Sequence, residues 1–161
     1  MDIYYDDGKD SICIELKFHR CGTVASAFAH TDAAGSLFND LRRLQAFVPF
    51  TTTKPVRRLL VYVTDDEMHQ YLGVPSARVN PTYRNELKRF YDLSKGTSIM
   101  FSDGGFGTAP KTFLESASAT FPSAPTPFSV PVQSVYQKDF AVPGCRSLKG
   151  YNCHIRAYEV L

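Results

Sequence analysis

Two carboxylates and one ammonium stand close together in the first eighteen residues of the chain. Glu15 and Lys17 interrupt an apolar run, and Asp2 lies near the start of the sequence. Carboxylate oxygens are ligands that Mg²⁺ prefers, and a nearby ammonium can orient a metal-bound water or offset negative charge on a phosphate. These residue types indicate metal-dependent chemistry on a phosphate ester, provided that folding brings the three side chains together.

A β-hairpin with a two-residue Asp-Gly turn at positions 7 and 8 satisfies that condition. Its register pairs Tyr5 with Asp10 and Asp2 with Cys13. Opposed side chains share a face of the sheet, so the face that carries Asp2 also carries Cys13, Glu15 and Lys17. The alternation predicts that the other face enters the core, and this face carries Ile3, Ile12, Ile14, Leu16 and Phe18.

This arrangement resembles the signature of the PD-(D/E)XK nuclease superfamily, whose members share the restriction-endonuclease-like fold. In that signature an Asp opens one hairpin strand and Glu-x-Lys lies in the next; the matching residues here are Asp2 and Glu-Leu-Lys at 15–17. The segment NDLRRL at 39–44 resembles the Asp-x-x-Arg-Leu helix of many prokaryotic members, and LLVYVTDD resembles the strand that follows it. The motifs cover residues 1–66, and the remainder is similar only in the order of its elements.

The resemblance implies a single α/β domain over residues 1–161, with a mixed β-sheet flanked by helices. It implies hydrolysis of phosphodiester bonds in a nucleic acid, with DNA favoured over RNA. Asp2 and Glu15 would hold Mg²⁺, or Mn²⁺ in its place, and Lys17 would complete the catalytic set. Members of the superfamily normally carry a helix before this hairpin, whereas this sequence starts inside the hairpin. The expectation is therefore a domain without that first helix.

Three basic side chains are candidates for contacting the substrate phosphate. His19 lies two residues beyond Lys17 on the same predicted face, and Arg42 and Arg43 lie in the helix that follows. The structural alternatives are an exposed histidine at a strand end and ordinary charges on the polar side of a helix. In the second case, Asp40 and Arg43 form a surface pair at i,i+3 spacing.

Other interpretations of the same residues stay open. Glu15 and Lys17 fit the solvated face of an edge strand, and Asp6 and Asp7 suit turn chemistry. The whole pattern is also compatible with a catalytically incomplete relative of these nucleases that serves as a binding or assembly module, for instance one encoded by a phage or mobile element.

Composition restricts the class of protein. The chain has 161 residues, 43% hydrophobic and 21% charged, with a net charge of +2, which is typical of one globular soluble domain. It contains no run of about 18 apolar residues and no signal peptide pattern, so we expect no membrane partner and a cytoplasmic location. A homodimer is left open. The cysteines lack CxxC spacing, which favours reduced thiols over a zinc site; they are Cys13, Cys21, Cys145 and Cys153.

The apolar spacing predicts the elements that position these residues. Ser36 is a suitable N-cap for a helix over 36–48, whose apolar side carries Leu37, Leu41, Leu44 and Val48. Residues 19–35 are predicted to be a loop. Further along, we expect a strand at 57–66 buried on both faces, a helix at 82–93, an excursion at 102–131 with a short helix at 111–120, and two late strands.

An acidic cluster follows the predicted central strand. Asp65, Asp66 and Glu67 lie where the strand ends, which suits either a functional site or the cap of a following helix. The histidines His30, His69 and His154 show no metal-ligand spacing.

Overall fold

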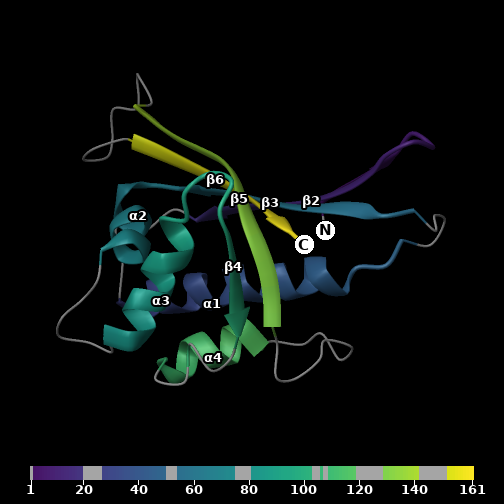
Figure 1. The fold of residues 1–161 in the computed structure, drawn as a ribbon. Helices are drawn as coiled ribbons and strands as arrows, with labels where there is room; N and C mark the ends of the chain where they lie inside the picture. Colours follow the sequence, from purple (N-terminus) through teal and green to yellow (C-terminus); the bar gives the residue numbers. More distant parts are fainter. Residues whose placement is uncertain are drawn as a thin grey trace.

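In the computed structural model, the six described strands form a mixed sheet and the four described helices form a layer beneath it (Figure 1). The described residues are 2–19, 27–49, 54–74, 81–102, 106, 109–118, 129–141 and 152–161. The strands are β1 (Ile3–Asp6), β2 (Ser11–His19), β3 (Val56–Thr64), β4 (Ser98–Ser102), β5 (Ser129–Ala141) and β6 (Asn152–Val160). The helices are α1 (Ala27–Ala46), α2 (Asp66–Gly73), α3 (Pro81–Tyr91) and α4 (Lys111–Ser118). The predicted α/β class is confirmed.

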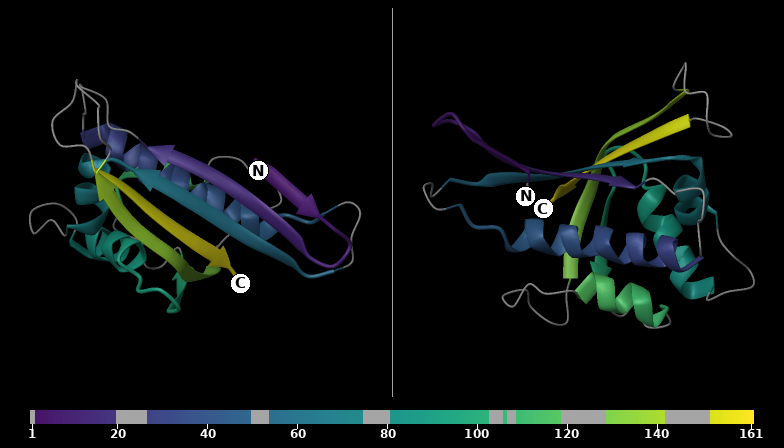
Figure 2. Two further views of the ribbon diagram at one scale, coloured as in Figure 1. Left: turned by 90° about the horizontal axis from the view of Figure 1, so that it is seen from above. Right: turned by 180° about the vertical axis from the view of Figure 1, so that it is seen from behind.

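The sheet has the order β1-β2-β3-β6-β5-β4. β1 and β2 form the predicted antiparallel hairpin, and β2 then pairs in parallel with β3 after the chain crosses over through α1. The remaining neighbours are antiparallel. Seen from above and from behind, the described helices all lie on one side of this sheet (Figure 2). We call this side the helix face and the other side the open face.

The hairpin turn is longer than predicted, and the register differs accordingly. Tyr5 pairs with Ile12 rather than with Asp10, which leaves a four-residue turn at positions 7–10. The Asp7 carboxylate accepts hydrogen bonds from the amides of Lys9 and Asp10, both at 2.8 Å, and Gly8 adopts a φ of 83° that favours glycine. Because the register shifts by two residues, every side chain keeps the face that the prediction gave it relative to its neighbours.

The prediction of which hairpin face enters the core was wrong. The helix face receives Cys13, which is fully buried, and Glu15, which is 7% exposed. Leu16 and Phe18, predicted to be core residues, are 50% and 62% exposed on the open face. The polar residues tolerate burial because α1 supplies partners for them, as described below. β3 also has only one covered face, since Leu60 and Tyr62 are buried whereas the neighbouring Val61 is half-buried.

α1 begins earlier than predicted and ends two residues sooner. It starts at Ala27, inside the segment predicted to be a loop, and Ser36 is therefore not an N-cap but donates from within the helix to the Ala33 carbonyl oxygen at 2.9 Å. Leu37, Leu41 and Leu44 are buried as predicted. Val48 lies beyond the end of the helix and is 75% exposed.

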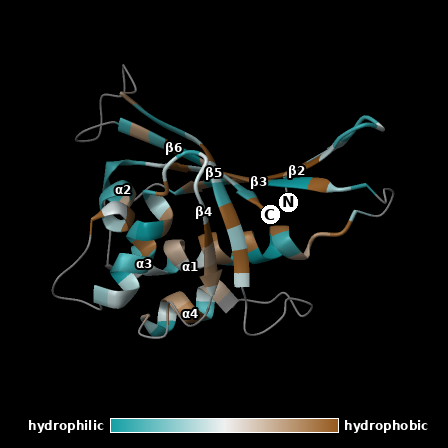
Figure 3. Cartoon of the chain, in the orientation of Figure 1, coloured by the Kyte–Doolittle hydropathy of each residue, from teal (hydrophilic) through white to brown (hydrophobic). Residues whose placement is uncertain are grey.

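A cluster of aromatic rings joins α1 to the rest of the helical layer. Phe38 lies at its centre, with ring centroids 4.8 to 5.6 Å from those of Phe90, Phe101, Phe106 and Phe113. Hydropathy follows the same layout, with apolar segments on β4 and β5 where they pass α1 and polar residues at the tip of the hairpin (Figure 3). The core that positions the candidate site is therefore the contact between α1 and the sheet.

The later elements match the predictions in part. α3, α4 and the two late strands are confirmed, and Leu87, Phe90 and Tyr91 are buried in α3. α2 and β4 were not predicted. Asp65 caps α2, since its carboxylate accepts from the Met68 amide at 2.9 Å, which confirms the capping alternative. None of the described helices is long and apolar enough to cross a membrane.

Candidate functional site

Four charged side chains from β2 and α1 meet on the helix face, and we call them the β2–α1 cluster: Glu15, Lys17, Asp40 and Arg43. Arg43 Nη1 lies 3.2 Å from Glu15 Oε1 and 3.1 Å from Asp40 Oδ1, so one nitrogen bridges two carboxylates. Lys17 Nζ lies 2.7 Å from Asp40 Oδ2. Glu15 and Asp40 are almost fully buried, whereas Arg43 is partly exposed at 38% of its side chain. The cluster therefore reaches solvent on the side of Arg43.

Sequence spacing explains how these residues meet. Glu15 and Lys17 are two positions apart on a strand, so both point to the helix face. Asp40 and Arg43 are three positions apart on α1 and lie on the same side of that helix. The β2–α1–β3 crossover lays α1 along β2, which aligns the two pairs. Asp40 was considered a surface residue in the sequence, but at 4% exposure it is part of the interior of the cluster.

Asp2 lies beside this cluster at the edge of the hairpin. Its backbone N–H donates to the Ile14 carbonyl at 3.2 Å, and its Oδ2 accepts from the Leu16 amide at 2.7 Å. The carboxylate is thus fixed one peptide unit from Glu15. The side chain is exposed, and the predicted sharing of a cation between Asp2 and Glu15 stays a prediction.

His19 follows Lys17 on the same face, as predicted, but it is held inside the structure. Its Nδ1 lies 2.8 Å from the Tyr62 hydroxyl and its Nε2 lies 3.4 Å from Ser36 Oγ. Burial, with a smaller contribution from the nearby Lys17 charge, lowers the pKa of His19 to about 4. The ring is therefore neutral at pH 7, which suits a hydrogen-bonding role more than an ionic contact with phosphate.

The two predicted arginines behave differently. Arg43 joins the β2–α1 cluster, whereas Arg42 is 6% exposed and donates from Nη1 to the Ala117 carbonyl of α4 at 2.9 Å. The structure brings together Glu15, Lys17 and Arg43, and it does not bring Arg42 to them.

The donor atoms of the cluster are compatible with a divalent cation. Among the described residues, no group of three or more His, Cys, Asp or Glu side chains is arranged to hold a metal ion. Mg²⁺, however, commonly uses one or two carboxylates and completes its shell with water and substrate phosphate. The bridging Arg43 nitrogen shows that positive charge is already accepted between Glu15 and Asp40. Arg43 fills that position, whereas Glu15 and the neighbouring Asp2 offer two hard carboxylate groups that fit such a Mg²⁺ site.

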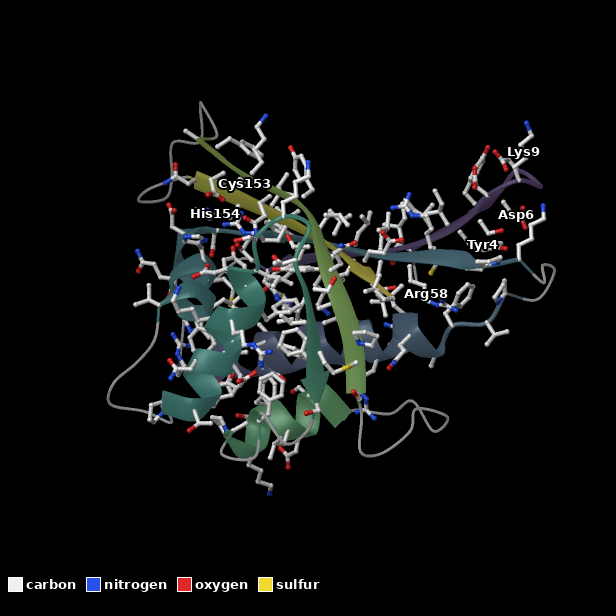
Figure 4. All side chains as sticks on the ribbon, in the orientation of Figure 1. Tyr4, Asp6, Lys9, Arg58, Cys153 and His154 are labelled. Atoms are coloured by element: carbon white, nitrogen blue, oxygen red, sulfur yellow. The ribbon has the colours of Figure 1, made fainter. Side chains whose placement is uncertain are left out.

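A second polar cluster, not predicted from the sequence, lies where β5 and β6 meet α2; we call it the β6 cluster. His154 Nδ1 lies 3.0 Å from Asp139 Oδ1, and its Nε2 lies 3.0 Å from Asp66 Oδ1. Arg156 Nη1 donates to the same Asp139 oxygen at 2.7 Å, and His69 stacks on His154 with centroids 3.7 Å apart. Figure 4 shows His154 at the end of the sheet far from the hairpin residues Tyr4 and Lys9.

The electrostatics of the β6 cluster indicate a structural role. Burial alone would raise the pKa of Asp66, but hydrogen bonds with the His154 ring and from Asn152 lower it overall. Burial likewise opposes ionisation of Asp139, yet the hydrogen bonds from Arg156 and with the His154 ring hold its pKa below the usual value. Both carboxylates therefore stay ionised and tie α2 to the β5–β6 pair. The position of Asp66 after a buried strand was the one sequence signal for this cluster.

Comparison with family models, with curated proteins and with solved structures found no match for this chain.

Proposed function

We propose that the chain is a Mg²⁺-dependent nuclease whose chemistry is carried by the β2–α1 cluster together with Asp2. The observation that carries this proposal is that the Leu16 amide holds the Asp2 carboxylate at 2.7 Å, one peptide unit from Glu15, while Lys17 lies two residues beyond Glu15 on the same face. Asp2 adds a third carboxylate, so the five groups together have a formal charge of −1 when all are ionised. That excess, at a site that reaches solvent, favours recruitment of a cation.

The side chains have distinct roles in this proposal. Asp2 and Glu15 are the ligands for Mg²⁺, and Asp40 lies beside them and holds Lys17 in place through its ion pair at 2.7 Å. When bound, the cation would lower the pKa of a coordinated water and offset charge on the scissile phosphate. Lys17 supplies a fixed positive charge near the developing negative charge. His19 and Arg42 have no part in this proposal, because Tyr62 and the Ala117 carbonyl hold them.

The substrate in this proposal is a nucleic acid, with DNA favoured over RNA, and Mn²⁺ can replace Mg²⁺. The resemblance of Asp2 and of Glu-Leu-Lys at 15–17 to the nuclease signature supports this, as does the hairpin–helix–parallel strand order around them.

The test compares the wild type with Glu15→Gln, Lys17→Ala and the control Glu159→Gln on labelled single-stranded DNA, duplex DNA and RNA. Glu159 is a matched control because it also pairs with an arginine, Arg57, at 2.8 Å, but on the open face. We expect Glu15→Gln to abolish cleavage and Mg²⁺ binding, and Lys17→Ala to slow cleavage by about 10²–10³ while Mg²⁺ still binds. Glu159→Gln should cleave normally. Cleavage that survives both EDTA and Glu15→Gln would refute the mechanism.

One observation favours a second candidate function. Each charge of the β2–α1 cluster already has an opposite charge within 3.2 Å, so the cluster is held closed by its own ion pairs. This is the state expected for a catalytically incomplete module that only binds DNA or protein. Calorimetry with Mg²⁺ on the wild type and on Arg43→Gln separates the two. Tighter Mg²⁺ binding by Arg43→Gln supports the nuclease, whereas no binding by either protein supports the module.

A further inference from the structure

The open face of the sheet carries a continuous apolar surface. It comes from the residues that face away from α1 on β1, β2, β3, β6 and β5, and the strand registers place them in adjacent rows. One row runs from Leu16 through Val61 and Ala157 to Tyr136, and the next runs from Phe18 through Val63 to Ile155. Figure 2 shows this face uncovered by the described helices.

The exposure of this surface is larger than single scattered side chains explain. Six large apolar residues on it are between 38% and 62% exposed: Ile3, Tyr5, Leu16, Phe18, Tyr136 and Phe140. At roughly 200 Å² for each complete side chain, they expose roughly 600 Å². Half-buried neighbours such as Leu59 and Val63 add roughly 20–70 Å² each on the same basis, which brings the total to roughly 800 Å². The largest apolar patch on an ordinary monomer is about 300–600 Å².

Charge on the open face is sparse and mostly neutralised within the chain. Among the described residues of the strands that form it, the charged side chains are Arg57, Glu159 and Lys138. Arg57 donates two hydrogen bonds to the Glu159 carboxylate, at 2.8 and 3.0 Å. A surface with one net positive charge offers little to a polyanion such as DNA. Pairing of this open face with the open face of a second copy brings almost no like charges together.

From these observations we propose that the open face is the interface of a homodimer, with the open face of a second copy as its occupant. An area of about 800 Å² per partner is what a standard stable interface buries. A two-fold axis through the patch would stack the two sheets face to face, as in sheet sandwiches with a spacing of about 10 Å. This inference is independent of the proposed nuclease function, because the β2–α1 cluster lies on the helix face.

The test measures the mass of the complete chain in solution by light scattering and analytical ultracentrifugation. We expect about twice the 18.0 kDa of one chain at micromolar concentration. Phe18→Asp and Tyr136→Asp, on opposite sides of the patch, should each weaken dimerisation by at least 100-fold while circular dichroism shows the fold intact. Leu114→Asp is the matched control, since Leu114 is 43% exposed on α4 in the helical layer, and it should remain dimeric.

Several outcomes would overturn the proposal. A wild type that stays monomeric up to about 100 μM excludes the second copy as occupant, and binding of that monomer to neutral lipid vesicles would assign the face to a membrane instead. A dimer that both Phe18→Asp and Tyr136→Asp leave intact, or that Leu114→Asp alone disrupts, places the interface elsewhere. Hydrogen exchange gives an independent readout: β2 and β5 should become protected as the concentration rises, and α4 should not.

Discussion

His19 makes the stability of this protein depend on pH in a predictable direction. The folded chain holds its imidazole with a pKa of about 4, because burial and the neighbouring Lys17 disfavour the charged form. In the unfolded chain the pKa returns to about 6.5. Between these values the unfolded chain binds a proton at His19 that the folded chain does not, so acid favours unfolding. The stabilisation is fully present above pH 6.5 and is lost as the pH falls towards 4.

The magnitude follows from the two pKa values. A pKa difference of about 2.5 units means that His19 changes the free energy of unfolding by at most about 3 kcal/mol over the whole titration. About 2 kcal/mol of this is lost between pH 7 and pH 5. For a domain of this size, that loss lowers the melting temperature by about 4–8 °C. His69 adds to the trend in the same direction, because burial lowers its pKa as well. The contribution of His19 therefore has to be isolated by comparison with a variant.

The assay measures urea unfolding of the wild type and of His19→Gln at pH 7 and at pH 5. Glutamine can still bond to Tyr62 and Ser36 but does not titrate, so the variant should lose about 2 kcal/mol less than the wild type over this interval. NMR titration of the His19 ring protons gives the folded pKa directly. An equal pH dependence in both proteins, or an NMR pKa near 6.5, would refute the reasoning.

Two further predictions concern the elements that hold the site. Gly35→Ala should destabilise the fold by about 1–3 kcal/mol in thermal unfolding, because its Cβ would lie 2.6 Å from the Phe113 carbonyl oxygen where α1 meets α4; an unchanged melting temperature would show that the two helices can separate at no cost. Asp65→Ala should cost about 1 kcal/mol by removing the cap on the Met68 amide of α2, whereas Asp65→Asn should keep most of that stability.

The βαβ unit that carries the site was predictable because its signals are local. Alternation identifies β2, helical spacing of Leu37, Leu41 and Leu44 identifies the second half of α1, and an apolar run identifies β3. The first half of α1 was missed because its sequence, AFAHTDAAG, has no apolar stripe. Its contacts are tertiary: the His30 ring stacks on Tyr71 with centroids 5.0 Å apart, and Gly35 lets α4 approach.

The wrong prediction of which face of β2 is buried has a physical explanation. Alternation separates two faces but does not say which one the helix covers, and hydrophobicity favoured the face of Leu16 and Phe18. The helix instead covers Glu15, because Arg43 arrives from α1 to pair with it. Burying the Glu15 carboxylate costs less free energy when an opposite charge pairs with it, and this partner, Arg43, lies 28 residues away in the sequence. No local pattern contains this information.

A series of polar and aromatic contacts runs across the helix face from the end of β2 to the β6 cluster. From His19 a polar contact passes to the Tyr62 hydroxyl, and the Tyr62 ring meets Tyr91 edge-on with centroids 6.5 Å apart. The Tyr91 hydroxyl lies 2.9 Å from Thr64 Oγ1 and 3.1 Å from His69 Nδ1, and burial raises the pKa of Tyr91 to about 12, so this hydroxyl keeps its proton. Both parallel strands end along this line, at the edge of the sheet where α/β folds place ligands. The contacts of His19 with Tyr62 and Ser36 therefore anchor the carboxyl end of β2 beside the β2–α1 cluster.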